Sequence, residues 1–133
     1  MALFSQFTFL VDTAADASDI VAAINSIEKL VTLRLSGNTI SPDGAEVISN
    51  ALSGRDELQH LLLSDIFTGR LKDEIPKAIQ FLNNALNYEG TNTRIRTLDL
   101  SDNAFGPNGA VAVEPFLNSK ACLKLVSTVY EVK

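Results

Sequence analysis

The stretch LVTLRLSGN, residues 30–38, decides the fold of this chain. Its leucines stand at positions 1, 4 and 6 and its asparagine at position 9, which is the template L-x-x-L-x-L-x-x-N. Residues 95–103 match this template again, and residues 58–66 match its three leucines with Ile66 in place of the asparagine. Three matches at offsets of 28 and 37 residues predict a protein built from stacked repeats.

Two weaker copies of the template flank these three. Residues 4–12 carry phenylalanines at the apolar positions and Asp12 at position 9, and residues 123–131 form a decayed copy. A unit of roughly 28 residues has room for a strand and a helix, as in leucine-rich repeats of the ribonuclease-inhibitor type. We therefore expect an α/β leucine-rich-repeat solenoid, a crescent with parallel strands on its concave face and helices on its convex face. Residues 1–133 would form a single domain of about four repeats, the last one incomplete.

Strands and helices should alternate along the chain. Parallel strands are expected near 31–35, 59–63, 96–100, 6–9 and 124–128. Helices are expected over 16–28, from Pro42 after the N-cap Ser41, from Pro76 with Ile79, Leu82 and Leu86 facing inward, and over 108–119. Because proline lacks an N–H group, Pro115 should kink or shorten the last helix.

One repeat is longer than its neighbours. The unit that begins at Leu58 carries about nine extra residues. They lie either in the loop 66–75 before the helix, or in the helix and the loop 87–93 after it. Loops on a rigid scaffold are where binding residues tend to sit, so this unit holds the first candidates for a site.

Two cations stand together in the loop 66–75, in a chain that is otherwise acidic. Arg70 and Lys72 follow Gly69, which permits unusual backbone angles. One interpretation is that they bind a partner. The other is that they pair with Asp73 and Glu74 next to them.

Polar residues at the template positions that face the concave side are further candidates. Asn38 and Asn103 at position 9 should bond backbone groups of the adjacent turn, a structural role. Asp65 and Asp102, both at position 8, either meet a basic partner or form a solvated rim. His60 at position 3 has no nucleophile or acid arranged with it that would indicate catalysis.

Composition excludes several classes of function. The chain has 133 residues and a net charge of −5, so nucleic acid is an unfavourable partner. One cysteine and one histidine cannot form a disulfide or a zinc site of those residues, and we expect no metal and no cofactor. Residues 1–11 lack the layout of a signal peptide and are too short to span a bilayer, which favours an intracellular protein. No phosphate-binding glycine loop or nucleophile elbow indicates an enzyme.

The sequence also resembles a known family. The run SDIFTGRLKDEIP, residues 64–76, resembles the signature segment of Ran GTPase-activating proteins. LSGNTI at 35–40 resembles the preceding repeat of that family, and LSDNAFGP at 100–107 resembles the following one. The resemblance covers essentially the whole chain but only the N-terminal part of a typical family member.

This resemblance implies a cytoplasmic protein that binds Ran in its GTP form and promotes GTP hydrolysis. The family is understood to use no arginine finger; it presses on the GTPase so that Ran's own glutamine orients the attacking water. Arg70 matches the arginine that the family needs for activity, and Lys72 matches the adjacent lysine. With Asp65, Asp73 and Asp102 they form the predicted GTPase-binding set. We expect Arg70 to be solvent-exposed and to be the main contact.

The sequence departs from the family near its end. The family's Asn-rich turn falls at 129–131, where no asparagine is present, so we expect weak or absent GAP activity. The alternative function is a protein-interaction scaffold without GAP activity. The β-prone residues 123–132 should self-associate through an open edge, fold back on the last helix or be disordered; alternatively, a separate chain supplies the missing repeats.

Overall fold

Strands and helices alternate in the computed structural model, which describes residues 10–103 and 105–129. The strands are β1 (Leu10–Val11), β2 (Thr32–Arg34), β3 (Thr39–Ile40), β4 (His60–Leu62), β5 (Thr97–Asp99) and β6 (Ser127–Val129). The helices are α1 (Ser18–Ser26), α2 (Pro42–Leu52), α3 (Glu74–Leu86) and α4 (Gly106–Leu117), followed by the short 3-10 helix η1 (Lys120–Cys122).

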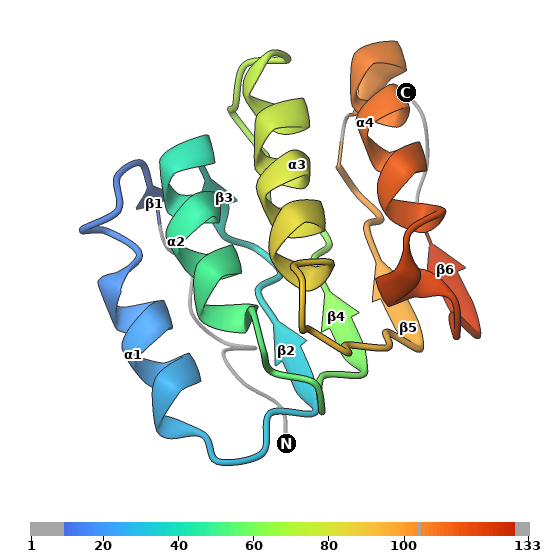
Figure 1. Cartoon of the computed structure of the whole chain (residues 1–133). Helices are drawn as coiled ribbons and strands as arrows, with labels where there is room; N and C mark the ends of the chain where they lie inside the picture. Colours follow the sequence, from blue (N-terminus) through green and yellow to red (C-terminus); the bar gives the residue numbers. More distant parts are fainter. Residues whose placement is uncertain (1–9, 104, 130–133) are drawn as a thin grey trace.

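One parallel sheet runs through the described chain in the order β2-β4-β5-β6. Equal template positions pair across it, since Leu61 lies opposite Leu33 and Leu98 lies opposite Leu61. The four helices stand side by side against one face of this sheet, each packed on the next (Figure 1). This arrangement confirms the α/β leucine-rich-repeat fold.

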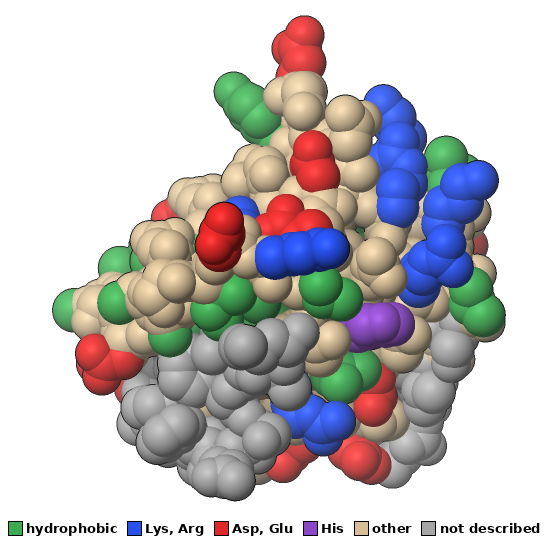
Figure 2. Space-filling view, turned by 90° about the horizontal axis from the view of Figure 1, so that it is seen from below, with side chains coloured by type: hydrophobic (Ala, Val, Ile, Leu, Met, Phe, Trp, Pro, Cys, Tyr) green, Lys and Arg blue, Asp and Glu red, His purple; other side chains and the backbone are tan. Residues whose placement is uncertain are grey.

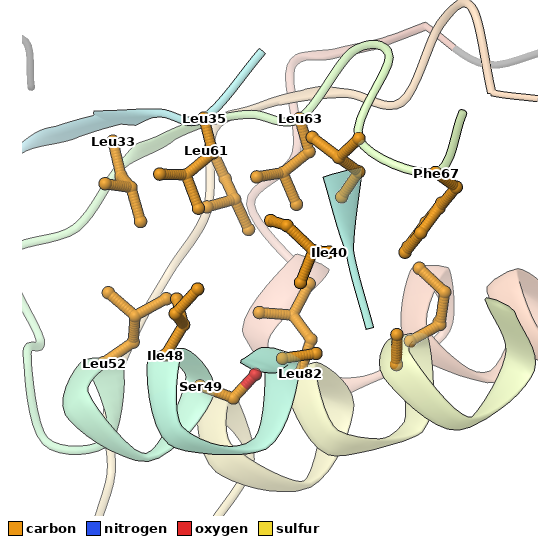
Figure 3. A pocket seen from close by; sticks show the side chains of 14 residues that line it. Leu33, Leu35, Ile40, Ile48, Ser49, Leu52, Leu61, Leu63, Phe67 and Leu82 are labelled. Carbon is orange, nitrogen blue, oxygen red and sulfur yellow. The ribbon is translucent and has the colours of Figure 1, made fainter. Parts of the chain in front are cut away.

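The template leucines form the core. Leu33, Leu61 and Leu98 are all fully buried, which stabilises each by about 2 kcal/mol relative to exposure. Between the strands and the helices α2 and α3 there remains an apolar cavity of about 30 Å³, with Ser49 as its one polar lining residue (Figure 3). Its lining is the repeat core itself, so it marks imperfect packing and not a ligand site.

The start of α2 follows the predicted capping pattern. Ser41 has an extended backbone and its hydroxyl accepts a hydrogen bond of 3.2 Å from the Gly44 N–H. Pro42 occupies the first helical position, where a missing N–H group costs nothing. The prediction of Ser41 as N-cap is confirmed.

The other helices differ slightly from their predicted ranges. α3 begins at Glu74, two residues before Pro76, and buries Ile79, Leu82 and Leu86 as expected. α4 covers Gly106–Leu117, with Pro115 inside it two residues before its end. Within the described ranges no helix is both long and apolar enough to cross a membrane.

The register of the last repeat corrects the sequence analysis. Thr128 lies opposite Leu98 at template position 4, a place that the template alignment had given to Val126. Val126 is 77% exposed instead, and Leu125 packs against the core. The alignment was therefore wrong by two residues. The template positions that had been given to 129–131 become 131–133, which lie outside the described residues. β6 extends the sheet and does not fold back on α4.

The register of the first repeat is also corrected. The parallel pairing of β1 with β3 places Asp12 beside Ser41, whose hydroxyl donates a 2.7 Å hydrogen bond to the Asp12 carbonyl. The template had aligned Asp12 with Asn38, three residues earlier. The strand expected at 6–9 lies outside the described residues.

Candidate functional site

The turns after β2, β4 and β5 each contain a left-handed residue. Gly37, Asp65 and Asp102, all at template position 8, have φ angles of 83°, 50° and 59°. Glycine and, less readily, aspartate and asparagine tolerate this region. The two acids therefore have a structural explanation that needs no basic partner, although Asp102 is exposed and Asp65 half-buried.

The two asparagines hold these turns in place. Asn38 and Asn103 are buried, and each donates to the position 6 carbonyl of its own repeat, at 2.7 and 3.0 Å. Asn103 also donates to the Leu63 carbonyl at 3.0 Å and accepts from the Ile66 N–H at 2.8 Å. Because the repeat of Ile66 lacks its own asparagine, it depends on that of its neighbour. The structural role predicted for both asparagines is confirmed.

The extra residues of the long repeat lie on both sides of its helix. Eleven residues separate β4 from α3, whereas seven separate β2 from α2. α3 has 13 residues against 11 for α2, and ten residues follow α3 before β5, where seven follow α2 before β4. Both predicted locations therefore contribute. The segment before α3 contains four of the nine extra residues and includes the rim loop, residues 66–73, at the upper end of the sheet (Figure 1).

Aromatic packing fixes the base of the rim loop. Ile66 and Phe67 are buried, and the Phe67 ring meets Phe105 of the next repeat edge to face, with centroids 6.2 Å apart. Gly109 lies under Phe105; a Cβ atom there would come within 2.7 Å of the Phe105 Cβ. Phe105 is the N-cap of α4 and Gly109 stands four residues after it, so this glycine leaves room for the Phe105 side chain beside the first turn, a requirement that sequence reasoning missed.

The far end of the rim loop is tied to the first turn of α3. The Leu71 N–H donates to Glu74 Oε1 at 3.0 Å, and the Glu74 N–H donates to the Leu71 carbonyl at 3.0 Å. Each residue thus donates its N–H to the other, to a backbone carbonyl in one direction and to a carboxylate in the other, and this closes the turn 71–74. Gly69 makes the reversal between the two ends with φ +81°.

The side chain of Arg70 is largely turned away from solvent, and the prediction of a solvent-exposed arginine is wrong. Its side chain is only 9% exposed. Nη1 contacts Asp12 Oδ1 at 2.6 Å and lies 3.8 Å from Glu74 Oε2, and Nη2 donates to the Thr39 carbonyl at 2.9 Å. The pairing with Glu74 was one of the two interpretations, but Asp12 is the closer partner. It stands 58 residues away in sequence and carried no signal that could have indicated the contact.

The residues that follow Arg70 point to solvent. Lys72 and Asp73 are exposed, and Leu71 between them and the arginine is 71% exposed. Of the predicted set, Arg70, Lys72 and Asp102 share one surface hollow of about 340 Å³; Asp65 and Asp73 do not line it. The remaining lining residues belong to the rim loop and to α3: Phe67, Thr68, Gly69 and Ile75. The hollow can therefore offer both signs of charge to a partner.

Arg55 and Glu57 form a second link between repeats that sequence reasoning missed. The Arg55 guanidinium donates to the Ile24 carbonyl at 2.9 Å and to that of Ile27. Glu57 Oε1 accepts from the Leu30 N–H at 3.1 Å and from Arg55 Nε at 3.0 Å. Burial alone would raise the pKa of Glu57, but these bonds and its own N–H lower it below its ordinary value.

The opposite end of the sheet carries a different kind of surface. Figure 2 shows this end, with Lys and Arg side chains gathered on the side of β5 and β6. Arg96, Lys120 and Lys124 are exposed there, on segments joined by the 2.7 Å bond from the Ile95 N–H to the Ala121 carbonyl.

The described residues hold no group of three or more His, Cys, Asp and Glu placed for a metal ion, and His60 is half-buried in β4.

Comparison with known proteins gives the family. A leucine-rich-repeat family model matches residues 27–49 and 91–113. Ran GTPase-activating protein 1 of Xenopus laevis is 41% identical over 122 residues, covering 92% of this chain and 21% of that protein. Ran GTPase-activating protein 2 of Caenorhabditis elegans is 41% identical over 94% of this chain and 13% of its own length. The Drosophila melanogaster Ran GTPase-activating protein is 41% identical over 86% of this chain and 19% of its own length.

The chain thus spans about a fifth or less of the length of these relatives. The similarity extends through the rim loop and the repeats on either side of it, as the coverage requires. This chain belongs to the Ran GTPase-activating protein family, as a leucine-rich-repeat portion of it.

Proposed function

We propose that this chain binds Ran in its GTP form and promotes GTP hydrolysis by Ran's own active site, in the cytoplasm. The chain would act as an activator and not as an enzyme by itself. The observation that carries the proposal is the rim loop: a segment resembling the family signature, fixed at both ends on a rigid repeat scaffold and exposed at its tip. The three relatives at 41% identity are named as Ran GTPase activators, which supports the same function.

Within this proposal, Lys72 and Asp73 contact the GTPase directly, because both side chains are exposed at the tip of the rim loop. Asp102 joins them across the shared hollow, and Asp65 lies at the equivalent turn of the preceding repeat. Charges of both signs at fixed positions set the orientation of a docked partner more than its affinity. Arg70 contributes indirectly, because its contacts with Asp12 and Glu74 support the rim loop.

A single-turnover hydrolysis assay tests the proposal. Ran loaded with GTP is mixed with increasing amounts of the chain, and binding is titrated in parallel with a non-hydrolysable GTP analogue on Ran. We expect measurable binding and weak stimulation, since residues 131–133, which the corrected register aligns with the Asn-rich segment of the family, also contain no asparagine. Binding without any stimulation would refute the activator role. If the chain neither binds Ran-GTP nor stimulates hydrolysis, the result would favour the alternative, an interaction scaffold with another partner.

A matched pair of variants locates the contact. Lys72→Ala should weaken Ran-GTP binding by about three- to tenfold, because an exposed interface charge is lost. Lys120→Ala removes another exposed lysine, at the opposite end of the sheet, and should leave binding unchanged. Equal effects of the two variants would place the contact outside the rim loop.

Self-association through residues 123–132 is a separate proposal. β6 has one neighbour in the described sheet, β5, so its other edge can pair with another chain. Size-exclusion chromatography with light scattering decides it, and a concentration-independent monomer would refute it.

A further inference from the structure

The contact between Asp12 and Arg70 joins two distant parts of the repeat array. Asp12 follows β1 in the first repeat, and Arg70 lies in the rim loop of the third. Asp12 is held by its own backbone: its carbonyl accepts the Ser41 hydroxyl at 2.7 Å, and its N–H donates to Asp16 Oδ2 at 3.1 Å. The carboxylate is therefore presented to Arg70 from a fixed point.

The guanidinium of Arg70 is turned toward the protein. Nη1 serves Asp12 and Glu74, Nη2 serves the Thr39 carbonyl, and the side chain is 9% exposed. A guanidinium donates in one plane, and here that plane is directed at fixed acceptors of three repeats. Arg70 can therefore influence a partner through the shape of the rim loop, without touching it.

The route from Arg70 to the exposed tip is short. Glu74 lies 3.8 Å from Arg70 Nη1 through Oε2, and its Oε1 accepts the Leu71 N–H at 3.0 Å. Lys72 and Asp73 stand between these two bonded residues, so the Leu71–Glu74 turn sets their direction. A change at Asp12 reaches them through three successive polar contacts: Asp12 with Arg70, Arg70 with Glu74, and Glu74 with Leu71.

We infer that Asp12 is a positioning residue for Ran binding: its carboxylate holds Arg70, and Arg70 holds the rim loop in the shape that presents Lys72 and Asp73. The claim about Ran binding rests on the proposed function. The structural half of the inference, that Asp12 and Arg70 hold the shape of the rim loop, does not. Asp12→Asn keeps the size of the side chain and removes the charge from the contact. Asp19→Asn, on an exposed acid of the first turn of α1, is the matched control.

Two measurements on the full chain test the inference, at a temperature where circular dichroism shows every variant folded. The first is amide hydrogen exchange at Arg70 and Leu71, whose N–H groups bond Phe67 O and Glu74 Oε1. The second is the affinity for Ran-GTP. Asp12→Asn should raise both exchange rates and the Kd by roughly fivefold, the upper range for losing one ion pair whose carboxylate is half-exposed. Asp12→Glu should recover part of each.

The outcomes separate the two claims. Unchanged exchange in Asp12→Asn would overturn the contact as a support of the loop, whether or not Ran binds. Raised exchange with an unchanged Kd would overturn the positioning role. Asp12→Asn should also add no further loss of affinity in an Arg70→Ala background, and an additive loss would show that Asp12 acts without Arg70. A parent chain that fails to bind Ran-GTP would refute the proposed function, and the exchange data would still decide the structural half.

Discussion

Replacing Asn103 by alanine tests how far one repeat depends on the next. The change removes three hydrogen bonds of a buried side chain: those to the carbonyls of Leu63 and Leu100, and the one from the Ile66 N–H. At about 1 kcal/mol each, the loss amounts to about 3 kcal/mol. Because domains of this size are stable by roughly 5–15 kcal/mol, the variant should lose a fifth or more of its unfolding free energy.

The assay is equilibrium unfolding in urea, followed by circular dichroism at constant temperature. Asn103→Ala should strongly lower the urea concentration at the unfolding midpoint, and it should lower the melting temperature by roughly 10 °C. Asn50→Ala, on an exposed position of α2, is the control and should be neutral or slightly stabilising. A loss below about 1 kcal/mol in Asn103→Ala would refute the reasoning, because water would then be replacing the side chain in the turn.

Three further results are expected. Arg70→Ala should lower the free energy of urea unfolding by about 1–2 kcal/mol, because Thr39 O and Asp12 lose their donor; unaltered stability would contradict its buried position. Glu57→Gln should lower the unfolding free energy at pH 7, above the ordinary pKa of 4.5, and this loss relative to the parent chain should vanish as acid protonates Glu57 through its lowered folded-state pKa. A loss that does not depend on pH would contradict this linkage. Burial raises the pKa of the Cys122 thiol, so iodoacetamide should modify it slowly at pH 7 and rapidly in urea; equal rates would contradict the burial.

The repeat pattern predicted the fold because spacing and burial agree in this architecture. In the repeats of β2, β4 and β5 the leucine at position 4 packs into the core, so Leu33, Leu61 and Leu98 are both the sequence signal and the core. The same logic assigned a structural role to Asn103, since a buried turn needs a polar partner. What it did not reveal is that Asn103 also bonds the preceding repeat.

The pattern failed where apolar residues are poor guides to register. Near the end of the chain Leu123 and Val126 fitted the template by type, yet both are exposed, and Thr128 takes the strand position. Strand pairing decides register, and a polar residue can occupy such a position. The burial of Arg70 was missed for a different reason: its partner Asp12 lies 58 residues away, and no local spacing encodes that contact.

The left-handed turn at template position 8 restricts which charges can evolve on the rim, the edge of the sheet formed by the turns after β2, β4 and β5. Exchanges among glycine, asparagine and aspartate preserve the turn, so Gly37, Asp65 and Asp102 can each alternate between neutral and negative. A lysine at the same place would carry about 1–2 kcal/mol of backbone strain. Mutation can therefore make the rim more or less acidic at little cost, whereas a cation is more easily gained in an inserted segment. Lys72 stands in such a segment, and the lengthened repeat is thus a route by which an acidic crescent can acquire selectivity for a partner of mixed charge.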